Sequence, residues 1–187
     1  PNQHALAREL VLLDNFYVDG EVSADGHNWS PGAYATDYLE KTWPTNYGGR
    51  GGDYGAEGTK EIANNKVFLW DQCKAKGVSY RTYGEFADNN KANLKVLEGH
   101  FCPYYTSWDE SVKDTVRFRQ WQREFDSLLA VNAVPRLNTV RFINDHTEGL
   151  RPERPTPFAH VADNDLAVGL FVEYLSKSPI WKETAIF

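Results

Sequence analysis

Segments with the pattern of buried strands alternate with segments of helical pattern along this 187-residue chain. The strand patterns are short apolar runs rich in β-branched and aromatic residues, at residues 10–18, 78–83 and 139–143. Helical spacing of apolar side chains marks residues 4–9, 27–40, 66–76, 109–131 and 157–176. This alternation predicts an α/β domain with a mostly parallel sheet, whose functional loops follow the carboxyl ends of strands. The last helical segment is apolar nearly all round, so we expect it to be buried.

The composition narrows the possible partners of such a domain. The chain has 20 basic and 26 acidic residues, a formal net charge of -6, and no block of Lys or Arg. Because affinity for a nucleic-acid backbone comes from clustered cations, we expect no nucleic-acid partner. No run approaches the ~20 apolar residues of a membrane-spanning helix, so we expect no transmembrane segment. Aromatic residues make up 14% of the chain, which favours a folded core over disorder.

The two ends of the sequence have the character of an internal piece of a larger domain. The chain begins at Pro1 and contains no Met. Its last residues, 184–187, have the pattern of a buried strand that has just begun. We therefore expect a fragment truncated at both ends, with apolar surface that is exposed there or covered in a homo-oligomer.

Two cysteines, Cys73 and Cys102, match no spacing of a zinc or redox motif. They predict either one disulfide in an oxidising compartment or two buried free thiols. Neither lies in a recognisable cysteine-hydrolase signature.

The loop after the first predicted strand carries four polar side chains within six residues, namely Ser23, Asp25, His27 and Asn28. A helix is expected to begin there, and backbone N–H groups at a helix N-terminus favour an anionic ligand. The Ser23 hydroxyl could therefore attack an anionic substrate, and Asn28 could donate to a substrate oxygen. The alternative is that Ser23 or Asp25 only caps the helix.

A second polar loop, residues 144–149, follows the strand pattern of residues 139–143. It contains Asp145 and His146, a carboxylate and an imidazole that suit zinc or a similar divalent metal. The alternative is an Asx-turn with an exposed imidazole. The acidic residues of 163–165 are interpreted as charge at the start of the last helix, with a metal site as the alternative.

Several of these segments together resemble the phosphoesterase family of the alkaline phosphatase superfamily, which includes phospholipase C-like and acid-phosphatase-like enzymes. The resemblance lies in residues 13–29, 70–71, 80–86, 144–147 and 157–187, and is closest to bacterial members. It implies an α/β three-layer sandwich with a mostly parallel sheet, alkaline phosphatase-like and truncated at both ends. Residues 1–187 would then be the central part of a single phosphoesterase domain.

The resemblance also implies roles for the residues of the two loops. Ser23 falls at the nucleophile, which forms a covalent phospho-enzyme. Asn28 falls close to an Asn that holds a phosphoryl oxygen, and His27 is its neighbour in the substrate-binding loop. Asp145 and His146 fall in one cluster of ligands for divalent metal ions, with zinc expected and manganese or calcium as alternatives. The remaining ligand motifs are absent from the sequence, so the metal site is expected to be incomplete.

The implied function is that of a metal-dependent phosphoric ester hydrolase. Its substrate would be a phosphate-ester small molecule or a phospholipid, its location periplasmic or extracellular, and the 187 residues alone inactive or nearly so. A sulfatase is disfavoured because Ser23 lacks the C/S-x-P-x-R context, whereas a nucleotide pyrophosphatase or phosphodiesterase stays open. The alternative from another class is a non-catalytic cell-surface or carbohydrate-binding module, which the aromatic content suits.

Overall fold

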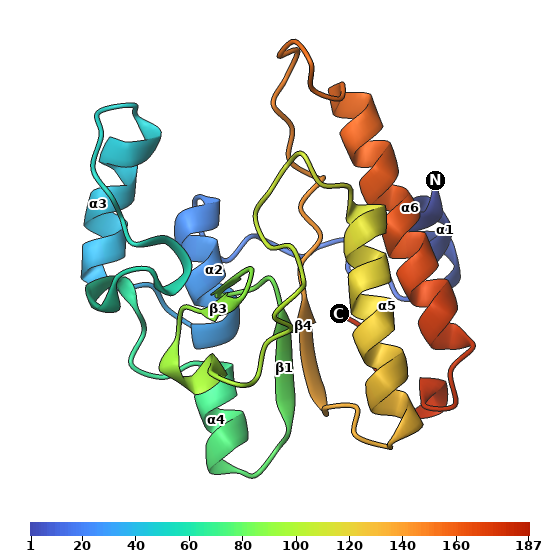
Figure 1. Ribbon diagram of the computed structural model, residues 1–187. Helices are drawn as coiled ribbons and strands as arrows, with labels where there is room; N and C mark the ends of the chain where they lie inside the picture. Colours follow the sequence, from blue (N-terminus) through green and yellow to red (C-terminus); the bar gives the residue numbers. More distant parts are fainter. The chain divides into compact units, whose positions relative to one another are not determined.

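The computed structural model describes residues 1–187 and divides into two compact units. The first unit comprises residues 1–14, 108–131 and 141–187, and the second comprises residues 15–107 and 132–140. The helices are α1 (Asn2–Glu9), α2 (Ser23–Gly32), α3 (Asp37–Tyr47), α4 (Leu69–Ala75), α5 (Asp114–Ala130) and α6 (Pro157–Ser176) (Figure 1). The strands are β1 (Tyr80–Tyr83), β2 (Ala87–Asp88), β3 (Lys91–Ala92) and β4 (Leu137–Val140). Short 3-10 turns cover η1 (Ala56–Gly58), η2 (Glu61–Ala63), η3 (Lys95–Leu97) and η4 (Trp181–Glu183).

The first unit is built on the pair α5 and α6, which lie side by side in Figure 1. Phe118, Trp121 and Phe125 recur at helical spacing on α5 and are all buried. The Trp121 ring lies 4.3 Å from the ring of Phe171 on α6, measured between centroids. Burial of such rings is the main apolar contribution to a helix pair of this kind.

Helix α6 begins and ends where the sequence predicts. Thr156 caps it by accepting a hydrogen bond from the Ala159 N–H, and Pro157 occupies the first turn, where the missing N–H costs nothing. The expectation that this helix is buried all round is wrong. Only four of its side chains are buried, and Phe158 is 91% exposed, because α5 and α1 cover part of its circumference.

Asp165 on α6 holds the short helix α1 in the first unit. Its carboxylate accepts hydrogen bonds from the backbone N–H groups of Asn2 and Gln3, at 2.7 and 2.9 Å. Pro1 provides no side-chain cap to α1, so Asp165 satisfies first-turn donors from another helix. Gly169 makes the close approach possible, because a Cβ there would lie 2.5 Å from Cγ of Asn2.

The second unit contains a small parallel sheet of β1 and β4, in register from Tyr80 opposite Leu137 to Tyr83 opposite Val140. In its core, side chains of β1, α4 and the 3-10 turn η3 pack against one another. The buried members of this cluster are Phe68, Trp70, Cys73, Tyr80, Phe86, Leu94, Val96 and Leu97. Helix α4 ends before Gly77, whose φ of +64° suits glycine. The mixed helix and strand composition with a parallel strand pair agrees with the predicted α/β class.

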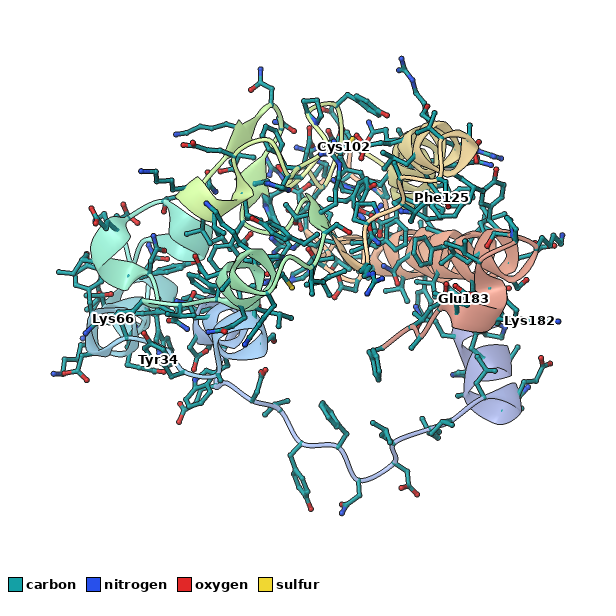
Figure 2. The ribbon with its side chains drawn as sticks, turned by 90° about the horizontal axis from the view of Figure 1, so that it is seen from below. Tyr34, Lys66, Cys102, Phe125, Lys182 and Glu183 are labelled. Carbon is teal, nitrogen blue, oxygen red and sulfur yellow. The ribbon has the colours of Figure 1, made fainter.

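Residues 27–40, predicted as one helix, belong to two. Ala33 adopts the left-handed conformation and ends α2, and Thr36 caps α3 by accepting from the Leu39 N–H. Tyr34, in the connection between the two helices, accepts a hydrogen bond at its hydroxyl from the Lys66 N–H (Figure 2). The single helix was predicted from the spacing of apolar residues, and that spacing does not show where one helix ends and the next begins.

The strand predicted over residues 10–18 is absent. The segment has no secondary structure, and Val11 and Val18 are 86% and 87% exposed. A strand requires a neighbour for its backbone N–H and C=O groups, and the pairing of β1 with β4 does not include this segment. Residues 184–187 likewise form no strand. The structure divides the chain into two compact units. That residues 1–187 form the central part of a single domain stays a prediction.

Cys73 and Cys102 are both buried free thiols, as one of the two alternatives predicts. Burial raises the pKa of the Cys73 thiol. None of the helices combines the length and apolar character needed to span a bilayer.

Candidate functional site

Ser23 is the first residue of α2 and its side chain is exposed. The residue before it, Val22, has no side-chain oxygen with which to cap the helix. Asp25 takes that role from inside the first turn, since its carboxylate accepts from the N–H groups of Glu21 and Val22 at 2.9 Å each. Asp25 is 2% exposed. Of the two candidate caps, Asp25 therefore performs the capping and Ser23 does not.

His27 lies one turn after Ser23 and is tied to a carboxylate from outside the helix. Its Nδ1 is 2.7 Å from Oε1 of Glu85, and the two side chains are 24% and 15% exposed. Glu85 follows the carboxyl end of β1, and its backbone carbonyl accepts from the Thr82 hydroxyl at 2.7 Å. A carboxylate on one ring nitrogen fixes the orientation and the tautomer of an imidazole.

Glu85 is the residue of this site that sequence reasoning missed. Its sequence signal was its position two residues after β1, since the carboxyl ends of parallel strands carry functional loops. The partner on α2 is 58 residues away, so no local spacing links the two side chains.

Asn28, predicted to bind substrate, lies inside the second unit. It is 2% exposed, and its amide donates to the carbonyl of Ala63 at 2.9 Å and to Oδ1 of Asn65 at 3.0 Å. Asn65 donates back to the carbonyl of Asn28 at 3.2 Å. This arrangement gives Asn28 a structural role that joins α2 to the chain after η2, and both amide hydrogens are already used.

A shallow groove in the second unit is lined in part by Ser30 of α2. Its volume is about 500 Å³, and its lining residues are Phe16, Tyr17, Val18, Asp19 and Ser30. Ser30 is seven residues after Ser23, so helical spacing places the two on one face. The Ser30 hydroxyl donates to Asp19 and to the carbonyl of Gly26, both at 2.9 Å. Ser30 is therefore committed to local hydrogen bonds, unlike Ser23.

Asp145 and His146 belong to the first unit and contact each other. Nδ1 of His146 lies 2.7 Å from Oδ1 of Asp145, with side-chain exposures of 38% and 62% for the imidazole and the carboxylate. The His146 ring also packs edge-on against Trp108, with 4.8 Å between centroids. The structure therefore brings the two predicted metal ligands together as a partly exposed pair.

A buried polar network fixes the loop that carries this pair. The Asp114 carboxylate, fully buried, accepts from the N–H groups of Ile143 and Asn144 at 3.0 and 2.7 Å. It also accepts from the buried Arg117 guanidinium at 3.1 Å and from Asn164 at 2.9 Å. The backbone directly before Asp145 is thus held by a charged residue of α5.

The metal site implied by the sequence resemblance is only partly represented by these residues. Catalytic zinc takes three protein ligands and structural zinc four. Asp145 and His146 supply two, and no group of three or more His, Cys, Asp or Glu side chains is placed to hold an ion. Asp163 and Asp165 bind protein donors instead, including the N–H groups of Asp114 and Gln3.

Comparisons with protein-family models, with curated proteins and with solved structures find no match to this chain.

Proposed function

We propose that this chain carries the nucleophile of a phosphoric ester hydrolase, and that Ser23 is that nucleophile. The observation that carries the proposal is the position of Ser23, exposed at the first turn of α2 and one turn before a His27 tied to Glu85. A serine becomes a nucleophile beside a base that a third group orients, and the His27–Glu85 pair supplies the oriented base one turn after Ser23.

The start of α2 also suits a phosphoryl group. The N–H groups of the first helical turn point out of the helix, and the helix dipole adds partial positive charge there. Asp25 accepts from the N–H groups of Glu21 and Val22, which precede the helix, and not from those of Ser23 and Ala24 in its first turn. A phosphoryl oxygen bound to these donors would lie beside the Ser23 hydroxyl.

The proposal extends to the features that the resemblance implies. Asp145 and His146 would supply two ligands of a divalent metal ion, which adds Lewis-acid polarisation of the phosphoryl group when bound. The substrate would be a small phosphate ester or a phospholipid, and the location periplasmic or extracellular. The three-layer, alkaline phosphatase-like sheet belongs to the same proposal.

Trapping of the covalent intermediate tests the proposal, because it detects a single phosphorylation of Ser23 even though the 187 residues alone are expected to turn over little or no substrate. The chain is incubated with p-nitrophenyl phosphate and Zn²⁺ or Mn²⁺, quenched in acid, and weighed as intact protein by mass spectrometry. We expect a fraction that carries one phosphoryl group in the wild type and in Ser30→Ala, and none in Ser23→Ala. Absence of the phosphoryl group from the wild type, or its persistence in Ser23→Ala, would contradict the proposal.

A further inference from the structure

We propose that His27 is the general base for the Ser23 hydroxyl and that Glu85 is its positioning residue. This inference rests on the proposed function, because it concerns how the same nucleophile is activated. It adds to that function by naming the side chain that takes the hydroxyl proton and the side chain that positions it, both of them in the second unit.

Helix geometry brings the hydroxyl and the imidazole to the same place. Ser23 and His27 are four residues apart on α2, a spacing that puts their Cβ atoms about 5–6 Å apart on one face. Side chains on a helix lean towards its N-terminus, so the His27 ring leans towards the turn that begins with Ser23. Helical spacing therefore puts the base on the face of α2 that carries the hydroxyl, and Nε2 has to come within hydrogen-bond distance of that hydroxyl in the substrate complex.

Glu85 gives the imidazole the tautomer that the reaction needs. With Nδ1–H donating to Oε1 of Glu85 at 2.7 Å, the lone pair of the neutral ring lies on Nε2. The carboxylate also stabilises the imidazolium that forms when Nε2 takes a proton. At 15% exposure the Glu85 side chain is partly shielded from water, which strengthens this interaction.

The reaction step balances without a co-reactant. The Ser23 oxygen forms a bond to the phosphorus of the ester while its proton passes to Nε2 of His27. The bond from phosphorus to the leaving oxygen breaks in line with the attack, on the side away from His27, so that oxygen takes its proton from solvent and the imidazolium releases its proton to solvent. The ring is then neutral again for attack of water on the phospho-enzyme.

A purely structural role for the same pair is the competing explanation. The His27–Glu85 contact joins α2 to the loop after β1, so either substitution could act through stability alone. The experiment therefore needs a readout that stability does not move. Chemical rescue is such a readout, because free imidazole can replace a base but cannot replace a contact between two elements.

The test measures the rate at which a fluorophosphonate probe modifies Ser23. In this reaction the serine oxygen forms the bond to phosphorus, fluoride leaves, and the hydroxyl proton needs a base. We expect His27→Ala to slow modification by at least about a hundredfold and Glu85→Gln by at least about tenfold. Added imidazole should restore a large part of the rate in His27→Ala and leave Ser23→Ala unmodified.

Control variants and outcomes separate this inference from the proposed function. His4→Ala removes an exposed imidazole elsewhere and should leave the rate unchanged; thermal unfolding of each variant checks its fold. Modification of Ser23 at an unchanged rate in His27→Ala, or a slowed rate that imidazole does not rescue, overturns the role of His27 while Ser23 remains the nucleophile. A wild type that the probe does not modify at Ser23 overturns this inference, and phosphoryl trapping then decides the proposed function separately.

Discussion

At the scale of single residues, burial separates the charged side chains that hold the structure from those that could do chemistry. Asp114 and Arg117 are fully buried and paired at 3.1 Å, whereas Lys41 and Asp37 form an ion pair at 2.8 Å on the surface. Removing one partner of a buried pair leaves an uncompensated charge, whereas an exposed pair exchanges its partner for water.

We expect Asp114→Ala to lower the free energy of unfolding by about 3–5 kcal/mol, because it leaves the Arg117 guanidinium buried without its carboxylate. It also removes the acceptor for two backbone N–H groups before Asp145. The matched control Asp37→Ala, which removes one partner of an exposed pair, should lower the free energy of unfolding far less. Denaturant titration followed by fluorescence measures both values. Equal costs for the two variants would show that the network does not stabilise the fold.

Residue type singled out Ser23, His27 and Asn28 as candidates, whereas Glu85 and the partners of these residues could not be predicted from the sequence. The helix was predicted from about residue 27, but it begins at Ser23, where Asp25 acts as the cap. The contacts of His27 with Glu85 and of Asn28 with Asn65 span 58 and 37 residues. Such partners depend on which strands and helices become neighbours, and a single sequence carries little information on that.

At the scale of elements, hydrogen bonds attach α1 to α6, and the Asp165 carboxylate accepts several of them, beside a bond from Gln3 to Asn164. Asp165 accepts from two first-turn N–H groups of α1, and these hydrogen bonds, that of Gln3 first, hold the pKa of Asp165 below its ordinary value. A lowered pKa in the folded state means that ionised Asp165 stabilises the docked helix above the ordinary value of 3.8. That contribution is lost as the pH falls through the folded-state pKa.

We therefore expect α1 to lose protection on acidification before the rest of the first unit does. Amide hydrogen exchange of residues 2–9, expressed as protection factors between about pH 6 and about pH 2, measures this. Asp165→Asn should show low protection in α1 across the whole range, because its neutral amide is a weaker acceptor. Protection in α1 that stays constant with pH in the wild type would contradict this role.

The elements that the sequence predicts well are those that local interactions define. The Thr156 cap and Pro157 fix the start of α6, and Gly77 marks the end of α4. Residues 10–18 have an equally clear strand pattern but form no strand, because a strand is completed by its neighbours. Whether such a segment pairs with the edge of a sheet depends on the tertiary structure and not on its own residues.

At the scale of the whole molecule, the most unusual feature is apolar surface left in contact with water. The segment of residues 10–18 exposes between 57% and 87% of each of its seven large apolar side chains. Exposed β-prone segments of this kind promote association of chains. The homo-oligomer expected from the sequence stays a proposal that this surface favours.

We expect the wild-type chain to associate increasingly with concentration and the double variant Val11→Lys, Val18→Lys to associate less. Both valines are more than four-fifths exposed, so the substitutions should leave the fold unchanged. Sedimentation velocity over a range of concentrations measures the average mass. Identical behaviour of the two proteins would show that this segment does not mediate association.

Site mapping of the trapped phosphoryl group asks whether one serine, at the start of α2, is the nucleophile. The acid-quenched reaction with p-nitrophenyl phosphate is digested, and the modified residue is located by tandem mass spectrometry. Ser23 and Ser30 lie on the same helix face, but Ser30 already donates to Asp19. We expect the phosphoryl group on Ser23 alone. A phosphoryl group on Ser30 or on any other residue, or none at all, would contradict it.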